Sequence, residues 1–313
     1  MQPADVFEEL RPLLFSIAYR MLASVASAED VLQEAFLRFD AAVREGTAIA
    51  SPKAYLSAVV TRLAIDELRS ARVRREAYVG TWLPEPLLTD TTNEVAIDPA
   101  AHAEAAETLS MAFLLVLDRL NPVERAVFLL HDVFGYEYAE IAPIVGKSEV
   151  NCRQIAARAR RQVQGEKPRL DASRRARHDV AQRFFSAMRS GDVDDLARLL
   201  AADVVVHGDG GGKVPQWSQA IVGVDRVTRL LAGVGRQIGE LRLTIEPHDV
   251  NGQPGAVIRD ADGHVTNVFS LDIRDGQVQT IRSVVNPDKL RHLGEVADVR
   301  AMARRLTSRG EPA

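Results

Sequence analysis

Apolar residues recur at helical spacing in two separate parts of this chain, residues 1–76 and 102–165. The first part contains three such patterns, which predict a helix within residues 1–24, a second that begins at a capping box of Ser27 and Asp30, and a third over residues 52–76. The second part predicts four more helices. Both parts are therefore expected to be all-α domains in which each helix buries one face.

The last two predicted helices, within Tyr138–Gln164, have the pattern of a helix-turn-helix. Gly146 is expected to end the first helix and Ser148 to cap the second, whereas Pro143 should make the first helix start late or bend. One side of the second helix is small and apolar. The other side, with the cap, offers side chains suited to bases and phosphates in a DNA major groove: Ser148, Asn151, Arg153, Gln154, Arg158, Arg160 and Arg161. The alternative is an ordinary helical hairpin with a solvated basic face.

Beyond residue 176 the pattern becomes mixed. Two short helices within residues 180–200 are followed by a strand at 204–207 and a helix from Gly223 to Gly233. Three hairpin turn signals then separate apolar runs: Asn251-Gly252, Asp262-Gly263 and Asp275-Gly276. They predict a four-stranded antiparallel sheet over about residues 239–285, with helices on one face, which is an α+β domain.

These patterns give a multidomain organisation. The expected segments are a helical domain at 1–76, a linker at 77–101, a helical domain at 102–165, a linker at 166–176, an α+β domain at 177–290 and a tail at 291–313. The first linker contains two prolines around Glu85 and cannot continue a helix. Its residues Trp82, Leu83 and Leu87 are too apolar for a free tether, so we expect the linker to lie on a surface.

Charge and composition limit the classes of function. The net charge of −4 over 313 residues leaves no overall basic field, so nucleic-acid binding must depend on local patches. One such patch ends the third helix, at Arg69, Arg72, Arg74 and Arg75, where a solvated surface helix is the alternative. A single cysteine, no apparent signal peptide and no apolar run near 18 residues predict a cytoplasmic protein without a membrane span.

Several stretches resemble the sigma factors of bacterial RNA polymerase. Residues 27–38 (SAEDVLQEAFLR) and 54–69 resemble sigma region 2, and residues 120–142, which include LNP, FGY and AEIA, resemble region 4. With only these two regions, the chain resembles the extracytoplasmic function (ECF) group over about residues 5–165. The resemblance implies binding to the β and β′ subunits of core RNA polymerase and recognition of promoter DNA at the −10 and −35 elements.

The same resemblance implies roles for residues. The docking surface for core polymerase would include Asp30, Gln33, Glu34, Phe36 and Leu37. Contacts near the −10 element would come from Arg62, Arg69, Arg72, Arg74 and Arg75. The predicted helix-turn-helix would recognise the −35 element in the major groove.

Residues 177–290 resemble a SnoaL-like domain of the NTF2-like cone class, and a subgroup of ECF sigma factors has such an extension. Three motifs of this chain resemble motifs of that subgroup: Trp82-Leu83-Pro84-Glu85-Pro86, Asp209-Gly210-Gly211-Gly212-Lys213 and Asn286-Pro287-Asp288-Lys289-Leu290. If the extension holds the linker, it could replace a separate anti-sigma protein. The glycine loop would then bring backbone N–H groups and the Lys213 ammonium close to Glu85 or another partner.

Two other functions stay open. One is a ligand-responsive DNA-binding regulator with an unidentified small ligand in the C-terminal pocket. The other is an enzyme, because relatives of this cone class include isomerases, hydrolases and cyclases; the candidate residues are His207, Asp209, Trp217, Arg259, His264 and Asn267. No spacing typical of metal ligands and no nucleophile beside a base is evident. We therefore expect a sigma factor modulated by its own C-terminal domain, with no enzymatic activity, metal or cofactor.

Overall fold

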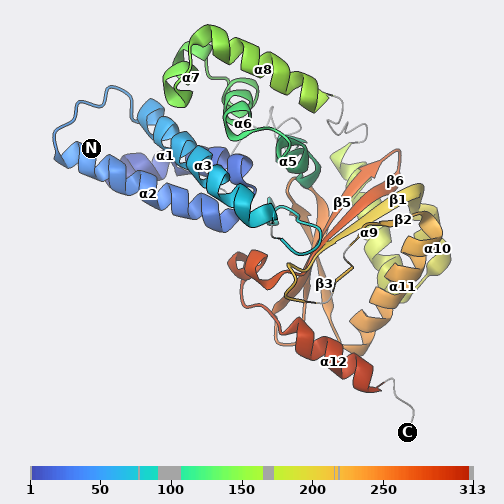
Figure 1. The fold of residues 1–313 in the computed structure, drawn as a ribbon. Coiled ribbons are helices and arrows are strands. Elements are labelled where there is room, and N and C mark those ends of the chain that lie inside the picture. Colours follow the sequence, from blue (N-terminus) through green and yellow to red (C-terminus); the bar gives the residue numbers. More distant parts are fainter. Residues whose placement is uncertain are drawn as a thin grey trace. The chain divides into compact units, whose positions relative to one another are not determined.

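The computed structural model describes residues 2–76, 78–90, 107–164, 173–214, 216–217 and 219–309. Their contacts divide the chain into two compact units, which are coloured along the sequence in Figure 1. Residues Met1–Ala77 and Thr91–Pro168 form the helical unit, and residues Tyr78–Asp90 and Arg169–Ala313 form the sheet unit. The predicted class, all-α regions followed by an α+β domain, is confirmed.

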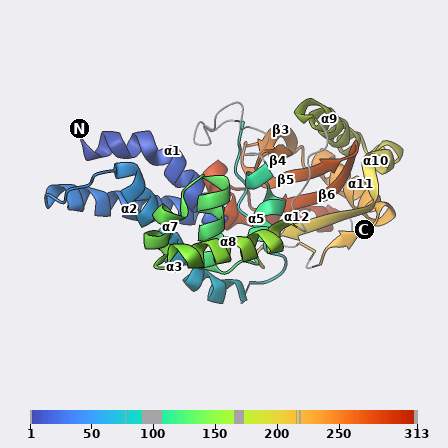
Figure 2. The same ribbon diagram turned by 90° about the horizontal axis from the view of Figure 1, so that it is seen from above.

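The helical unit is built from two groups of helices that lie in direct contact (Figure 2). The first group consists of α1 (Pro3–Leu22), α2 (Val25–Arg44) and α3 (Pro52–Glu76). The second consists of α5 (Met111–Leu117), α6 (Pro122–Phe128), the π-helix η3 (Leu129–Val133), α7 (Tyr138–Val145) and α8 (Glu149–Gln164). The helix-turn-helix expected over residues 138–164 is formed by α7 and α8.

Side-chain caps explain where several helices begin. Ser24 accepts a hydrogen bond from the Ser27 amide at 3.1 Å, so α2 begins at Val25 and the predicted start at Ser27 is wrong. Ser51 caps α3 by accepting a hydrogen bond from the Ala54 amide at 3.2 Å. Ser110 leaves the helical conformation and caps α5, so this helix begins at Met111.

The helix-turn-helix follows its sequence signals closely. Gly146 ends α7 in the left-handed conformation with φ of 65°, and Ser148 accepts a hydrogen bond from the Asn151 amide at 3.2 Å. The expected late start of α7 is wrong: the helix begins at Tyr138 and includes Pro143. Pro143 lies beyond the first turn of α7, so its missing N–H removes one backbone hydrogen bond from the helix.

A buried arginine joins the two helix groups. Arg125 of α6 is 1% exposed, and it donates to the carbonyl oxygens of Met21 at 2.6 Å and Leu117 at 2.9 Å and to Asp118 at 3.1 Å. The Met21 carbonyl belongs to the last turn of α1, where helical carbonyls lack intrahelical donors. A second junction is the hydrogen bond from the Tyr136 hydroxyl to Ser57 of α3, at 2.7 Å.

The sheet unit contains both helices and strands. Its helices are α9 (Arg174–Ser190), α10 (Val193–Leu199), α11 (Val224–Glu240), the 3₁₀ helices η4 (Pro287–Lys289) and η5 (Arg291–Leu293), and α12 (Val299–Arg309). Its strands are β1 (Leu200–Asp209), β2 (Ile221–Val222), β3 (Thr244–Val250), β4 (Gln253–Arg259), β5 (Val265–Arg274) and β6 (Gln277–Val284).

The sheet has six strands in the order β2-β1-β6-β5-β4-β3. All three predicted hairpin turns join antiparallel neighbours, so the arrangement of β3 to β6 is confirmed. The sheet is larger than these four antiparallel strands, because β1 joins β6 in parallel and β2 pairs with β1. Leu241 is not in a strand either, since α11 extends to Glu240.

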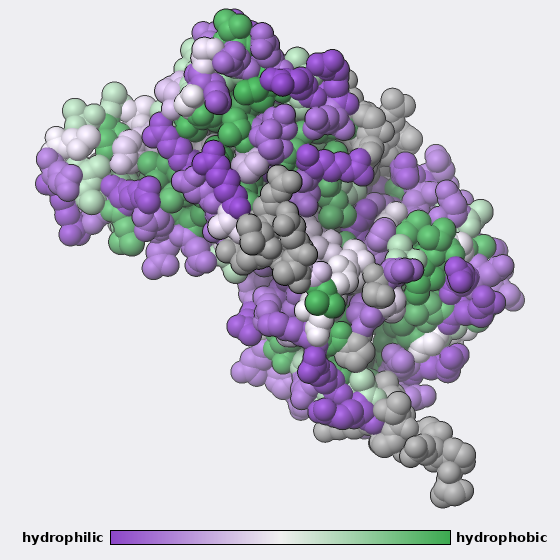
Figure 3. All heavy atoms as spheres, viewed as in Figure 1, coloured by the Kyte–Doolittle hydropathy of each residue, from purple (hydrophilic) through white to green (hydrophobic). Residues whose placement is uncertain are grey.

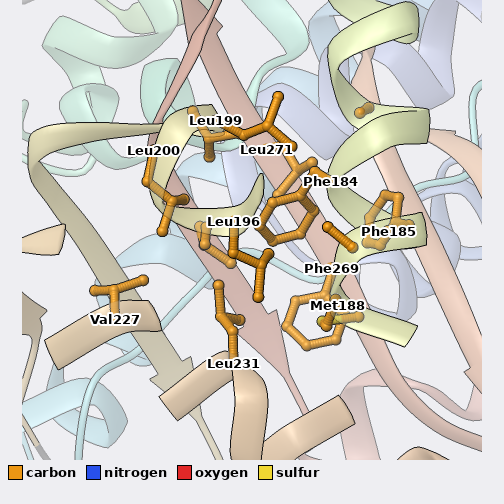
Figure 4. Packing of buried hydrophobic residues seen from close by; sticks show 14 of the residues in the cluster. Phe184, Phe185, Met188, Leu196, Leu199, Leu200, Val227, Leu231, Phe269 and Leu271 are labelled. Carbon is orange, nitrogen blue, oxygen red and sulfur yellow. The ribbon is translucent and has the colours of Figure 1, made fainter. Parts of the chain in front are cut away.

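Helices α9, α10 and α11 bury one face of this sheet. Figure 4 shows side chains of the three helices, such as Phe184, Leu196 and Leu231, gathered around Phe269 and Leu271 of β5. The packing of α11 on α9 is so close that a Cβ atom at Gly235 would lie 2.0 Å from the Met188 carbonyl oxygen. On the face seen in Figure 3, hydrophilic side chains cover most of the surface.

Among the described residues, no helix combines the length and the apolar character needed to cross a lipid bilayer.

Candidate functional site

Segment 78–90 packs against the rest of the sheet unit. It has no helix or named strand, and its side chains Leu83, Leu87 and Leu88 are buried. An isolated bridge pairs Leu88 with Val250 at the end of β3. The sequence expectation that this linker lies on a surface is therefore confirmed for residues 78–90, whereas residues 77 and 91–101 lie outside the described part of the chain.

Asp209, the last residue of β1, is the anchor for this segment. Its carboxylate is 0% exposed and accepts hydrogen bonds from the Tyr78 hydroxyl, the Leu83 amide at 2.8 Å, the Gly211 amide at 3.0 Å and the Lys289 ammonium at 2.7 Å. A buried carboxylate is stable only when it is paired in this way. Two of its four donors belong to segment 78–90, so folding of the sheet unit and docking of the segment are coupled.

Lys289 completes the same cluster. Its buried ammonium group also donates to the Leu83 carbonyl oxygen, and it lies 5.0 Å from the ring centroid of Tyr78 and 4.5 Å from that of Trp82. Cation–π contacts of this kind are strengthened when water is excluded. Burial, followed by the hydrogen bond to Asp209, raises the pKa of Tyr78, so its hydroxyl remains a donor; Asn286 in turn donates to that hydroxyl at 2.9 Å.

A second set of contacts holds the far end of the segment. The Leu87 amide donates to the Asn251 side chain at 3.0 Å, and the Asn251 amide donates back to the Leu87 carbonyl oxygen at 2.8 Å. Nε2 of His292 lies 2.7 Å from the Pro86 carbonyl oxygen, and burial lowers the pKa of His292, which favours the neutral ring as donor. The Thr89 amide donates to the carbonyl oxygen of Asp249 at 2.8 Å.

The helical unit presents a second candidate site on α8. Small side chains face inward, and Cys152, Ala156 and Ala159 are fully buried. Arg160 does not point away from the helical unit, because it forms an ion pair with Asp132 at 2.6 Å. That hydrogen bond raises the pKa of Arg160. Arg153 forms an ion pair with Glu149 and lies over the ring of Tyr138, 5.6 Å from its centroid. The remaining predicted side chains, those of Asn151, Gln154, Arg158 and Arg161, are on or next to the outward face.

A third candidate site is a hollow between α1 and α2. It has a volume of about 300 Å³, and its lining includes Phe7, Glu8, Asp30, Gln33 and Phe36. The rings of Phe7 and Phe36 meet edge to face with centroids 5.1 Å apart. Leu37, the next residue on α2, is 54% exposed beside this hollow.

Comparison with known proteins identifies the family. Residues 6–74 match the model of Sigma-70 region 2, residues 110–163 that of Sigma-70 region 4, and residues 181–286 that of the SnoaL-like domain. The chain is 40% identical over 297 residues to the ECF RNA polymerase sigma factor SigJ of Mycobacterium tuberculosis, covering 90% of this chain and 91% of that one. The chain belongs to the ECF sigma factors. The family predicted from its motifs is thereby confirmed.

Two further comparisons agree with this family. The probable ECF sigma factor SigI of Mycobacterium tuberculosis is 33% identical over 285 residues, which cover 90% of this sigma factor and 92% of SigI. The crystal structure of Mycobacterium tuberculosis SigJ matches with a TM-score of 0.70 and 38% identity, covering 92% of this chain and 98% of that one. The helical unit therefore contains sigma regions 2 and 4, and the sheet unit contains the SnoaL-like domain.

The three predicted regulatory motifs of the sigma factor converge on the Asp209 cluster. Trp82, Leu83, Asp209, Gly211, Asn286 and Lys289 are all part of it. Of the partners left open for Lys213, the structure shows Asp288, and the cation beside segment 78–90 is that of Lys289. Pro84, Glu85, Pro86 and Leu290 are buried, whereas Gly210, Gly212 and Pro287 shape the turns.

Sequence reasoning missed three residues of this site. Tyr78, Asn251 and His292 lie outside the three motifs, although each bonds directly to the segment or to Asp209. Asn251 had been assigned only to a hairpin turn. An aromatic residue at the very start of the linker is the signal that could have indicated Tyr78.

Of the arginines predicted to contact DNA in region 2, the structure describes the side chains of Arg62 and Arg69. Arg62 donates to the carbonyl oxygens of Pro143 at 2.7 Å and Ile144 at 3.1 Å, so in this conformation it binds the end of α7 and is not presented to a phosphate. Arg69 forms an exposed ion pair with Asp66 at 3.0 Å. The side chains of Arg72, Arg74 and Arg75 lie outside the described part.

The predicted core-binding residues lie on one side of α2. Asp30, Gln33 and Phe36 line the hollow described above, and Leu37 is exposed beside it. Glu34 forms an ion pair with Arg38 at 2.7 Å, one turn further along the helix.

The candidate catalytic residues are dispersed. His207 lies beside Arg282 across the β1–β6 pair, and burial, followed by the Arg282 charge, lowers its pKa. Arg259 pairs with Glu246 at 2.8 Å, and the Asn267 side chain accepts from Ser283 at 3.1 Å. The donors to Asp209 described above do not include His207. Trp217 packs against the hydrophobic core.

The turn between β4 and β5 departs from the sequence expectation. No metal-ligand spacing was evident there, yet ligand atoms of Asp260, Asp262 and His264 lie within 4.8 Å of one another. His264 already bridges Asp260 at 3.2 Å and Glu295 at 3.0 Å, and the hydrogen bond to Asp260 raises its pKa. Because His264 is already bonded to both Asp260 and Glu295, we assign these residues no metal.

Gly211 offers a direct test of the docking site. It has φ of 59°, and a Cβ atom there would lie 2.3 Å from Nδ2 of Asn286. We expect Gly211→Ala to displace Asn286 and to increase the rate of proteolysis within residues 77–101 at least several-fold. Gly276→Ala is the matched control, because its φ of 72° gives the same backbone strain with no heavy atom within 4 Å. Equal cleavage rates in the two variants would contradict the prediction.

Proposed function

We propose that this sigma factor directs core RNA polymerase to promoters through its helical unit, and that its SnoaL-like domain modulates this activity by holding segment 78–90. The segment joins region 2 to region 4 in the sequence. A domain that holds it therefore limits the separation and orientation that the two regions can adopt. In this proposal the SnoaL-like domain acts by binding and not by catalysis, and the protein works in the cytoplasm beside the polymerase.

The role of the helical unit is supported by its family and by its surfaces. The hollow between α1 and α2, with exposed Leu37 beside it, provides an apolar surface with an acidic rim for core polymerase. The outward face of α8 provides amide and guanidinium groups of the kind that bind bases and phosphates. Arg62 has to exchange its present partners on α7 for DNA if it contacts the −10 element.

The modulating role is carried by the fully buried Asp209 carboxylate. Two of its hydrogen bonds go to segment 78–90, and the Lys289 ammonium that neutralises it also bonds to the segment. Release of the segment would leave a buried charge with half of its donors, which is costly. The docked segment is therefore an integral part of the domain and is held by more than apolar contact.

Run-off transcription tests the proposal. Full-length protein is incubated with bacterial core polymerase and a promoter library, and initiation is compared with that of full-length Gly211→Ala and Gly276→Ala. We expect core-dependent initiation by the wild type and a changed yield or promoter preference only in Gly211→Ala. Duplex binding without any core-dependent initiation would instead support a ligand-responsive regulator. Initiation that is identical in all three proteins would exclude the modulating role.

A further inference from the structure

The centre of the outward face of α8 includes Val150, which is not among the side chains that the sequence indicated for DNA binding. Cys152, Ala156, Ala159 and Val163 define the buried side. At 100° per residue, the line opposite to them passes through Val150, Gln154, Ala157 and Arg161, whose spacings of four, three and four keep them on one face. All four are exposed.

The flanks of this line are chemically different. On one flank, Arg153 and Arg160 are engaged with Glu149, Asp132 and Tyr138. On the other flank lie Asn151 and Arg158, and the Arg158 guanidinium is 3.5 Å from the Gln154 carbonyl oxygen. The first two turns at the centre of the face are therefore apolar and amide in character, without a guanidinium.

Val150 is the distinctive member of the face. It is 59% exposed in the first turn of α8, where arginine, lysine, glutamine or glutamate would have a higher helical propensity than valine. The first turns of a recognition helix are those that contact base edges in the major groove. There an apolar side chain contacts the C5-methyl group of thymine, and a glutamine amide can pair with N6 and N7 of adenine.

Their separation matches neighbouring base pairs. Four residues of α-helix rise about 6 Å. Two base-pair steps of duplex rise about 7 Å. A helix that lies along the groove can therefore place Val150 and Gln154 on bases about two steps apart.

We propose that Val150 and Gln154 are specificity-determining residues, which recognise a thymine and, within about two base pairs, an adenine in the −35 element. This inference rests on the proposed function, since it assigns bases to the helix-turn-helix of an initiating sigma factor. Arg158 on one flank and Arg161 further along the face then bind phosphates and fix the position of α8 without contributing to base choice.

The test uses the full-length protein in complex with core polymerase. Templates with a randomised −35 element and a barcoded transcript are transcribed, and base preferences are compared among wild type, Val150→Ala, Gln154→Ala and Val193→Ala. Val193 is a matched control, because it is an exposed valine on α10 of the sheet unit, with 46% exposure.

We expect Val150→Ala to reduce the preference for thymine about fourfold at one position, the effect of one lost methyl contact. Gln154→Ala should reduce the preference for adenine about 5- to 150-fold at a position within two base pairs. Val193→Ala should match the wild type.

Three other results would overturn the inference. Unchanged base profiles in Val150→Ala and Gln154→Ala, with normal initiation, would refute it and leave the proposed function intact. A uniform loss over all sequences would show that the two residues only position the helix. Failure of the wild type to initiate on any template would refute the proposed function and the inference with it.

Discussion

Replacing Asp209 by alanine is expected to release segment 78–90 from the sheet unit. The change leaves the Lys289 ammonium buried without its counter-ion and removes acceptors from the Tyr78 hydroxyl and the Leu83 amide. Breaking a buried ion pair in this way costs about 3–5 kcal/mol. In a Trp217→Phe background, Trp82 is the sole tryptophan, so its fluorescence reports docking directly. We expect a red-shifted, more quenchable emission under native conditions.

Two further variants separate the electrostatic cause from general damage to the strand. Asp203→Ala removes an exposed carboxylate from the same strand, β1, and should leave the Trp82 emission unchanged. Asp209→Leu combined with Lys289→Met removes both buried charges, and it should recover much of the docking lost in Asp209→Ala. If Asp209→Ala behaves like Asp203→Ala, the anchoring role of Asp209 is wrong.

Replacing Arg125 by methionine is expected to destabilise the helical unit by about 3 kcal/mol. Methionine fills a similar volume, but it leaves the carbonyl oxygens of Met21 and Leu117 without their charged donor in a buried environment. Both tryptophans belong to the sheet unit, so their fluorescence during urea unfolding follows that unit alone. Circular dichroism at the helical band follows both units, and the difference between the two signals gives the unfolding of the helical unit. The loss of stability should be confined to the helical unit.

Arg38→Met is the control for this experiment. Arg38 forms an exposed ion pair with Glu34 in the same unit, which contributes at most about 0.5 kcal/mol. A loss in Arg125→Met as small as that in Arg38→Met would mean that water replaces the guanidinium at the junction of the two helix groups.

Local signals in the sequence predicted the elements that depend on local chemistry. Gly146 and Ser148 located the turn of the helix-turn-helix, and three Asn-Gly or Asp-Gly pairs located the hairpins, because these residues act on neighbouring backbone. The start of α2 was misplaced since Ser24 and Ser27 are equally good caps by composition. Pairing of β1 with β6 was missed, because a parallel pair between distant strands leaves no local signature.

For the candidate site too, the sequence indicated the local motifs but not the long-range contacts between them. The motifs around Trp82, Asp209 and Lys289 could be found in the sequence, but their pairing could not, and the sequence favoured Lys213 as the cation. Side-chain partners also decided which arginines of α8 face outward: Arg160 was predicted to bind DNA, yet Asp132, 28 residues earlier, holds it. Long-range contacts of this kind are set by packing and not by periodicity.

Covalent attachment of segment 78–90 has a consequence for the stoichiometry of regulation. The segment begins two residues after α3 ends at Glu76, so it cannot diffuse away from the domain that binds it. A tethered partner of this kind has an effective concentration of about millimolar. A separate protein competing for the same surface would have to reach a comparable concentration. Every copy of this sigma factor is thus made with one copy of its own binding partner, and the docked fraction does not depend on how much of the protein the cell makes.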